Sequence, residues 1–180
     1  SQYIGTAFLG DSSTNPIIAI SSGYFHSVFL AANGTVYGAG YNSNGELGDG
    51  TGLQRNTPIK SVKGLYNGTG FLGDNSSNPI ISLCTGAFNT LTLAAAGKLH
   101  VYGFNGNGQL GINSGANAIS PQIALKGSYA GTTHLGDQVA NPIIGLAASH
   151  FHSLCLAKDG TVYSFGYNGY GELGDSTLIQ

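Results

Sequence analysis

Two histidine–serine pairs, His26-Ser27 and His152-Ser153, carry the residue types of a nucleophilic active site. In such a site the histidine takes the proton of a serine hydroxyl to which it is hydrogen-bonded. Each pair lies in an apolar segment with the alternation of a strand, and adjacent residues of a strand point to opposite faces. The histidine is therefore not placed to activate its neighbour. We interpret both pairs as packing and hydrogen-bonding elements, and we predict no catalytic residue.

No spacing of donor groups predicts a bound metal or cofactor. His150 and His152 share one face of a strand, but a zinc site needs more donors than two. The glycine-rich segments 106–111 and 169–174 match a dinucleotide-binding pattern on paper, yet that pattern requires a following helix whose N-terminus faces the phosphates. We interpret the loop aspartates as turn formers and not as calcium ligands. They are Asp11, Asp49, Asp74, Asp137 and Asp175.

Three sequons for N-linked glycosylation begin at Asn33, Asn67 and Asn75. The first lies at a predicted hairpin tip and the other two in a long connection, so all three are expected to be exposed. Together with the low charge content they favour an extracellular or cell-surface setting. An intracellular setting stays open as the alternative.

The elements that position these residues repeat with a period of 63 residues. Such a period is typical of solenoids, propellers and other arrays, in which each unit buries its apolar faces against its neighbours. We predict repeats at 1–65, 66–128 and 129–180, the last of them incomplete. The repeated positions interpreted as structural are His26 and His152; Gly34, Gly97 and Gly160; Asn42, Asn105 and Asn168; and Glu46, Gln109 and Glu172.

Within one period the apolar residues alternate or run for a few positions between turn signals, which predicts strands and no helix. In the first copy the strands are expected at Pro16–Ser21, Phe25–Ala31, Thr35–Gly40 and Pro58–Lys63. Asn33-Gly34 predicts a two-residue hairpin with positive φ angles. We therefore predict an all-β, propeller-type array of four-stranded antiparallel blades, three in number, with both faces of each blade covered and the last blade lacking a strand.

Composition excludes several classes of function. Charged residues make up 8% of the chain and the formal net charge is −2, so no basic surface is available for nucleic acid. No apolar run is long enough to predict a membrane span. Cys84 and Cys155 occupy different positions of the repeat and are expected to be small buried thiols, with a bridge between repeats as the less favoured alternative.

The segment GYFHSVFLAANGTVYGAGYNSNGELGDGT, residues 23–51, resembles the repeat of the regulator of chromosome condensation family, and SHFHSLCLAKDGTVYSFGYNGYGELGDST, residues 149–177, resembles it more closely. The features in common are the His-Ser pair, the Asn-Gly or Asp-Gly hairpin, the aromatic-Gly-x-Asn exit and the Gly-Glu-Leu-Gly turn. The second copy departs from them at Asn89-Thr90 and at Leu99–Val101. The resemblance implies a β-propeller, usually of seven blades, that serves as a platform for protein partners.

The expected function is that of a non-enzymatic scaffold without a cofactor, which binds protein partners or copies of itself. Open blade faces and an unpaired edge strand predict either a longer propeller or head-to-tail assembly of copies. A head-to-tail contact that does not close into a ring gives a filament. The resemblance also implies nucleotide exchange on a small GTPase as an alternative, and a secreted enzyme inhibitor is a third. The loops expected to contact partners are 42–55, 66–78, 105–118 and 129–140.

Overall fold

The computed structural model describes residues 8–179, and within that range the regular structure consists of strands alone. This confirms the all-β prediction. The strands are β1 (Ile17–Ser22), β2 (His26–Ala31), β3 (Val36–Gly40), β4 (Arg55–Lys60), β5 (Ile80–Thr85), β6 (Asn89–Ala94), β7 (Leu99–Gly103), β8 (Ala118–Ile123), β9 (Ile143–Ala148), β10 (His152–Ala157) and β11 (Val162–Gly166).

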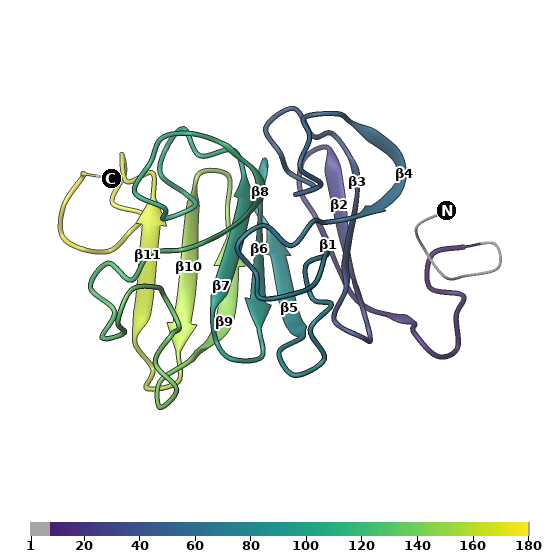
Figure 1. Ribbon diagram of the computed structural model, residues 1–180. Helices are drawn as coiled ribbons and strands as arrows, with labels where there is room; N and C mark the ends of the chain where they lie inside the picture. Colours follow the sequence, from purple (N-terminus) through teal and green to yellow (C-terminus); the bar gives the residue numbers. More distant parts are fainter. Residues whose placement is uncertain (1–7, 180) are drawn as a thin grey trace.

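The strands form three antiparallel sheets in which sequence neighbours pair with each other. Blade 1 is β1–β4, blade 2 is β5–β8, and blade 3 has only β9–β11. The prediction of three blades, the last without its fourth strand, is confirmed within the described residues. The sheets stand side by side in chain order, from blade 1 on the right of Figure 1 to blade 3 on the left.

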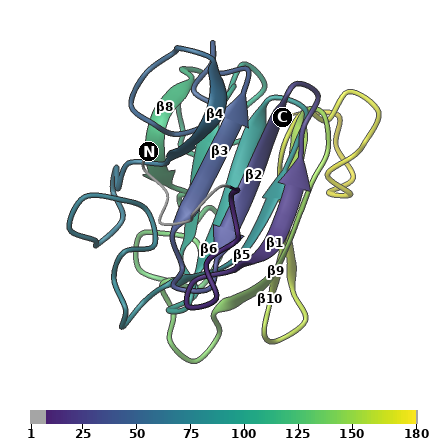
Figure 2. The ribbon, with the colours of Figure 1, turned by 90° about the vertical axis from the view of Figure 1, so that its right-hand side faces the viewer.

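The blades converge along their first strands, because β5 contacts both β1 and β9 (Figure 2). In each first strand the pairing register shifts by one residue at the same place, which is a β-bulge. The bulged residues Ile18, Ile81 and Ile144 are 60%, 54% and 54% exposed. A bulge redirects one side chain out of the pleat, so an isoleucine from every blade faces away from the core at the inner edge of the array.

The core lies between the sheets and not within any one of them. All six residues of β6 and all five of β7 are buried. Blade 2 thus has both faces covered, as expected from strands that are apolar on both sides. For the end blades the prediction of two covered faces stays a prediction, because each of them has one neighbouring blade among the described residues.

The fourth strand of the first copy begins and ends three residues earlier than predicted, at Arg55 and Lys60. Pro58 lies inside this strand, where it is tolerated because β4 is an edge strand and a proline there removes no ladder donor. The Ser61 N–H still donates to the Val36 carbonyl of β3 (3.1 Å), and Val62 then pairs with Phe71 in the connection to blade 2. The connections thus pack against the blades they join. The predicted boundaries between repeats, after residue 65 and after residue 128, stay predictions.

The β2–β3 hairpin has a three-residue loop, 32–34, and not the predicted two-residue loop. The Gly34 N–H donates to the Ala31 carbonyl (2.9 Å) and the Ala31 N–H to the Thr35 carbonyl (3.0 Å). Only the glycine of this loop has a positive φ, 90°, as in a type I turn followed by a bulge residue. The residue before the glycine needs no unusual conformation, which explains why the second copy has Ala96 at that position.

Candidate protein-interaction surfaces

We call the face of a blade that is turned towards the next blade in the chain its leading face, and the face turned towards the preceding blade its trailing face. In blades 1 and 2 the leading face is closed: Leu30 is 0% and Leu93 1% exposed. Their counterpart in blade 3, Leu156, is 40% exposed, and Val162 on the same face is 59% exposed. The leading face of blade 3 therefore presents an apolar surface without a neighbour among the described residues.

Blade 1 has the opposite face open. Ile20 pairs with Phe29 on its trailing face and is 75% exposed, and Phe29 is only partly buried. The counterparts Leu83 and Leu146 pack into the core between the blades. The two ends of the array therefore expose the two complementary halves of a contact that the molecule already makes twice.

A hydroxyl on the trailing face links each blade to the one before it. The Thr90 Oγ1 donates to the Glu46 carbonyl (2.8 Å), and the Ser153 Oγ donates to the Gln109 carbonyl (2.8 Å). Both donors are fully buried. Ser27 holds the same position in blade 1, on a face that no other blade covers among residues 8–179, and within that range its side chain makes no hydrogen bond. The serine of each His-Ser pair thus lies where it can couple blades.

The histidines of these pairs lie on the leading face. His26 Nε2 is 3.2 Å from Thr90 Oγ1 of blade 2, and burial lowers the pKa of His26 to about 4. His152 is partly exposed and its Nδ1 is 2.7 Å from Ser149 Oγ of its own blade. Neither ring contacts the serine that follows it, as expected for adjacent residues of a strand.

A buried asparagine closes the loop that follows the third strand of each blade. In blade 1 the Asn42 Nδ2 donates to Asp49 Oδ1 (2.9 Å) and to two loop carbonyls, while its Oδ1 accepts from the Leu47 N–H (2.9 Å). Asn105 and Asn168 make the corresponding contacts with backbone groups of their own loops, but only Asn168 also donates to an aspartate, Asp175. The repeated asparagines therefore fix the shape of the loops that are expected to contact partners.

Aspartates hold the turns. Partial burial by itself would raise the pKa of Asp49, but hydrogen bonds from Thr51, Arg55 and Asn42 lower it below its usual value. Asp74 accepts hydrogen bonds from three successive N–H groups and from the Thr69 hydroxyl, so that its pKa, which burial alone would raise, falls to about 2. These bonds are internal to the loops. Within the described residues no group of three or more His, Cys, Asp or Glu side chains has a metal-binding arrangement.

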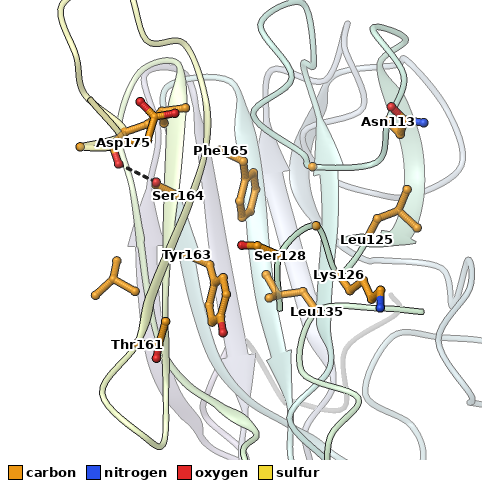
Figure 3. Close-up of a pocket in the computed structure, with 15 residues that line it drawn as sticks. Asn113, Leu125, Lys126, Ser128, Leu135, Thr161, Tyr163, Ser164, Phe165 and Asp175 are labelled. Atoms are coloured by element: carbon orange, nitrogen blue, oxygen red, sulfur yellow. Dashed lines mark hydrogen bonds between the residues drawn. The ribbon is translucent and has the colours of Figure 1, made fainter. Parts of the chain in front are cut away.

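The free edge of β11 borders a pocket of about 670 Å³ (Figure 3). Tyr163 and Phe165 line it from β11, and Leu135 and Ser128 line it from the connection between blades 2 and 3. In blade 2 the corresponding place beside β7 is taken by β8 and by Ala124, whose N–H donates to the Leu99 carbonyl (3.1 Å). The pocket therefore marks the position of the fourth strand that blade 3 lacks.

Aromatic rings gather where the second strands begin and the third strands end. Tyr24 lies against Phe88 (5.5 Å between ring centroids) and His150 (4.7 Å), and its hydroxyl is 3.0 Å from His150 Nδ1. Phe25 is 66% and Tyr24 60% exposed even though blade 2 covers the leading face of blade 1. These rings thus form a surface at the ends of the strands that inter-blade packing does not cover.

The two thiols lie in the core without a disulfide. Cys155 is buried and Cys84 partly buried, and both are free. Burial raises the pKa of Cys84 to about 12 and also raises the pKa of Cys155. The bridge between repeats is not formed in this structure, and thiols with such pKa values are poor nucleophiles.

The sequons differ in accessibility. Asn33 and Asn67 are exposed, whereas Asn75 is partly buried and its Nδ2 donates to the Asn67 carbonyl (2.8 Å). Glycosylation at these three positions stays a prediction.

No helix within residues 8–179 is long and apolar enough to span a membrane.

Comparison with known proteins identifies the repeat. The family model for the regulator of chromosome condensation (RCC1) repeat matches residues 17–46 and 143–172. The second copy, in which Asn89-Thr90 replaces His-Ser, lies outside these matches.

Curated relatives match most of this chain. The chain is 28% identical over 161 residues to the probable E3 ubiquitin-protein ligase HERC4 of Homo sapiens, a match that covers 89% of this chain and 13% of HERC4. It is 29% identical over 171 residues to the protein RCC2 homolog of Danio rerio, covering 88% of this chain and 32% of the homolog. The chain therefore spans about a third or less of the length of these relatives.

A solved structure shows the same fold. Prp20p of Saccharomyces cerevisiae superposes with a TM-score of 0.67 at 20% identity, over 91% of this chain and 35% of Prp20p. At this level of identity the likeness concerns the fold alone.

Proposed function

The chain carries regulator of chromosome condensation repeats, and on that premise we propose that it is a non-enzymatic propeller segment that serves as a protein-interaction scaffold. Further blades pack on its two open ends and protein partners bind its loops. The observation that carries the proposal is the pair of complementary open faces, with Leu156 40% and Ile20 75% exposed where their counterparts are buried or packed in the core. Exposed apolar surface of this kind marks an interaction site.

The blades that cover these faces come from a longer chain or from other copies of this one. A copy placed head to tail sets the leading face of blade 3 on the trailing face of blade 1, which brings Ser27 opposite the Glu172 carbonyl, as Thr90 is opposite that of Glu46. Because the contact is heterologous, repeated addition either closes a ring or extends a filament.

Assembly is tested by measuring the mass of the 180-residue chain against concentration, by light scattering or sedimentation. We expect the mass to rise with concentration, and we expect Ile20→Lys and Leu156→Lys each to lower it, since each charge falls in a face that becomes buried. Val139→Lys is the matched control, because Val139 is 92% exposed in the connection before blade 3. A monomer at all concentrations, or assembly that survives both face substitutions, contradicts head-to-tail association.

Partner binding by the loops rests on their exposure and on what relatives bind. Leu53 is 64% exposed in the loop of blade 1, and Val139 is the most exposed large apolar residue of the blade connections. Prp20p has been described for its binding to Gsp1p and histones, and yeast RCC1 has been solved with Kap60 bound. Binding of proteins through the loops is the corresponding property that we propose for this chain.

Nucleotide exchange on a small GTPase is the second candidate, because the fold matches that of Prp20p, which binds Gsp1p. The deciding assay is the release of a labelled guanine nucleotide from a GTPase on addition of the chain. Accelerated release supports exchange and removes the scaffold proposal in its non-enzymatic form; unchanged release leaves the scaffold. The enzyme-inhibitor alternative has no support from these comparisons.

The compartment stays a prediction. Glycans at the sequons would indicate an extracellular setting, and the exposed Asn33 and Asn67 are the acceptors with the better access. Mass spectrometry of the protein from its source tests this: a glycan mass at either asparagine supports the extracellular setting, and unmodified peptides leave the intracellular alternative open.

A further inference from the structure

Blade 3 contains a pocket of about 450 Å³ that is walled by aromatic rings. The imidazole rings of His150 and His152 belong to its lining. The other rings are those of Phe151, Tyr167 and Tyr170, and Glu172 is the acidic residue. The ring centroids of Phe151 and Tyr167 are 6.2 Å apart, and those of Tyr167 and Tyr170 are 6.3 Å apart. We call Phe151, the two tyrosines and Glu172 the aromatic pocket; it lies where β10 begins and in the loop that follows β11.

The pocket depends on a residue that departs from the repeat. Asn44 and Asn107 hold the position of Tyr170 in the other two copies. Tyr170 is 88% exposed, so the extra ring adds no core packing in this structure. An exposed aromatic side chain in place of a repeated asparagine needs a reason other than the stability of the blade.

The same departure leaves part of a carboxylate free. In blade 1 both oxygens of Glu46 are occupied by one residue: the Asn44 N–H donates to Oε2 (3.0 Å) and the Asn44 Nδ2 donates to Oε1 (2.6 Å). In blade 3 the Tyr170 N–H donates to Glu172 Oε2 (2.9 Å), but a tyrosine has no amide to replace the second bond. No hydrogen bond within the described residues reaches Glu172 Oε1, which is left to accept one from a ligand.

A close backbone approach orients the middle ring. A Cβ at position 169 would lie 2.1 Å from the Tyr167 hydroxyl. Gly169 therefore allows the Tyr167 ring to lie over the turn, whereas the first copy has Ser43 at this position. The corresponding Tyr41 lies at the same distance from its own Phe25 (6.2 Å), so the contact between these two rings is common to blades 1 and 3.

We propose that the aromatic pocket binds an arginine side chain of a protein partner. The faces of Phe and Tyr rings attract a cation, and the guanidinium group is planar, stacks on such rings and donates to carboxylates. Glu172 Oε1 supplies the acceptor and the Tyr170 ring the stacking face. The inference deepens the scaffold proposal, on which it rests for the nature of the partner, by naming the chemistry of one contact at an end of the array that no further blade covers.

Blade packing and arginine binding are linked. The counterpart carboxylate Glu46 is completely buried beneath blade 2, whereas the rings at the ends of the strands stay exposed. A blade added to the leading face of blade 3 would therefore cover Glu172 and leave only the rings. Binding is strongest when this end is free, so it is measured in dilute protein.

The test is an NMR titration of the 180-residue chain with N-acetyl-arginine methylamide, with the citrulline analogue as the uncharged probe of the same shape. We expect saturable shifts of the Tyr167 and Tyr170 ring signals with the arginine probe and binding at least about 10-fold weaker with citrulline. Tyr170→Asn and Glu172→Gln restore residues found at these positions in other copies, so the blade tolerates them. Each is expected to weaken binding by about 5-fold or more.

Phe25→Asn is the matched control, because it removes an exposed ring from blade 1 and leaves the pocket intact. Equal shifts with the citrulline probe, or unchanged arginine affinity in both pocket variants, overturn the inference. Chains that still assemble through their ends but do not bind the arginine probe remove the arginine site and leave the scaffold proposal. Chains that bind the probe but never assemble remove head-to-tail association and leave the site.

Discussion

Removal of one hydroxyl between blades 1 and 2 should destabilise the whole array. Thr90 is fully buried, its Oγ1 donates to the Glu46 carbonyl (2.8 Å), and His26 Nε2 lies 3.2 Å from the same oxygen. Thr90→Val keeps the shape of the side chain but leaves the carbonyl and the imidazole without this partner. A buried polar group that loses its partner costs about 1–3 kcal/mol, so we expect the free energy of unfolding to fall by about 2 kcal/mol.

The chain contains its own control at the equivalent position. Ser27→Ala removes the corresponding hydroxyl of blade 1, which makes no hydrogen bond within the described residues and is partly exposed. Its expected cost is about 0.5 kcal/mol or less. The assay is thermal unfolding followed by circular dichroism, at a concentration at which the chain is monomeric.

If blade coupling is the cause, Thr90→Val lowers Tm more than Ser27→Ala does. For a chain of this length a loss of 2 kcal/mol lowers Tm by about 4–8 °C, and Ser27→Ala should lower it by about 2 °C at most. Equal midpoints for the two variants would refute the reasoning, since they would show that the inter-blade hydrogen bond contributes nothing beyond the loss of a hydroxyl.

Three further outcomes are expected. Gly34→Ala should destabilise more than Gly160→Ala, since both glycines have φ near 90° but only at Gly34 does a Cβ meet a neighbouring proline ring (2.5 Å); urea unfolding checks this, and equal costs would contradict it. Burial lowers the pKa of His26 to about 4, so the free energy of unfolding should fall as the pH drops from about 6.5 towards 4. The fall should be less steep in His26→Asn, where His100, whose pKa burial also lowers to about 4, accounts for the remaining pH dependence. Cys84 and Cys155 should resist iodoacetamide in the native protein and react after unfolding, as mass spectrometry would show.

Sequence patterns predicted the fold because the signals for it are local and occur more than once. The 63-residue period, the alternation along each strand and the glycine after each second strand indicate blades without any knowledge of contacts. The errors were also local. The sequence predicts that a strand begins at Pro58, but Pro58 lies inside β4. A proline is tolerated there because β4 is an edge strand, which only the arrangement of the sheet shows. The loop at Gly34 has one more residue than predicted, because its hydrogen bonds and not its sequence define the turn.

The candidate surfaces were less accessible to sequence reasoning. The variable loops were expected to hold the partner sites, but the pocket in blade 3 needs Phe151 from the start of one strand and Tyr170 from the loop after the next. The available signal was Tyr170 at a position where the other copies have asparagine. The role of Tyr170 can be inferred only from the structure. There Glu172 Oε1 has no hydrogen-bond donor among the described residues, because the tyrosine lacks the amide with which Asn44 binds Glu46 in blade 1.

By itself the sequence determined that this protein is a set of similar antiparallel blades, because hydrophobic alternation and turn residues act over a few positions and are repeated in every copy. The tertiary structure alone decided which copy buries which face. Leu30, Leu93 and Leu156 are the same residue at the same repeat position, yet the last is 40% exposed and the others are buried. Burial depends on the neighbour that a blade finds in space, and no repeat unit encodes its own place in the order.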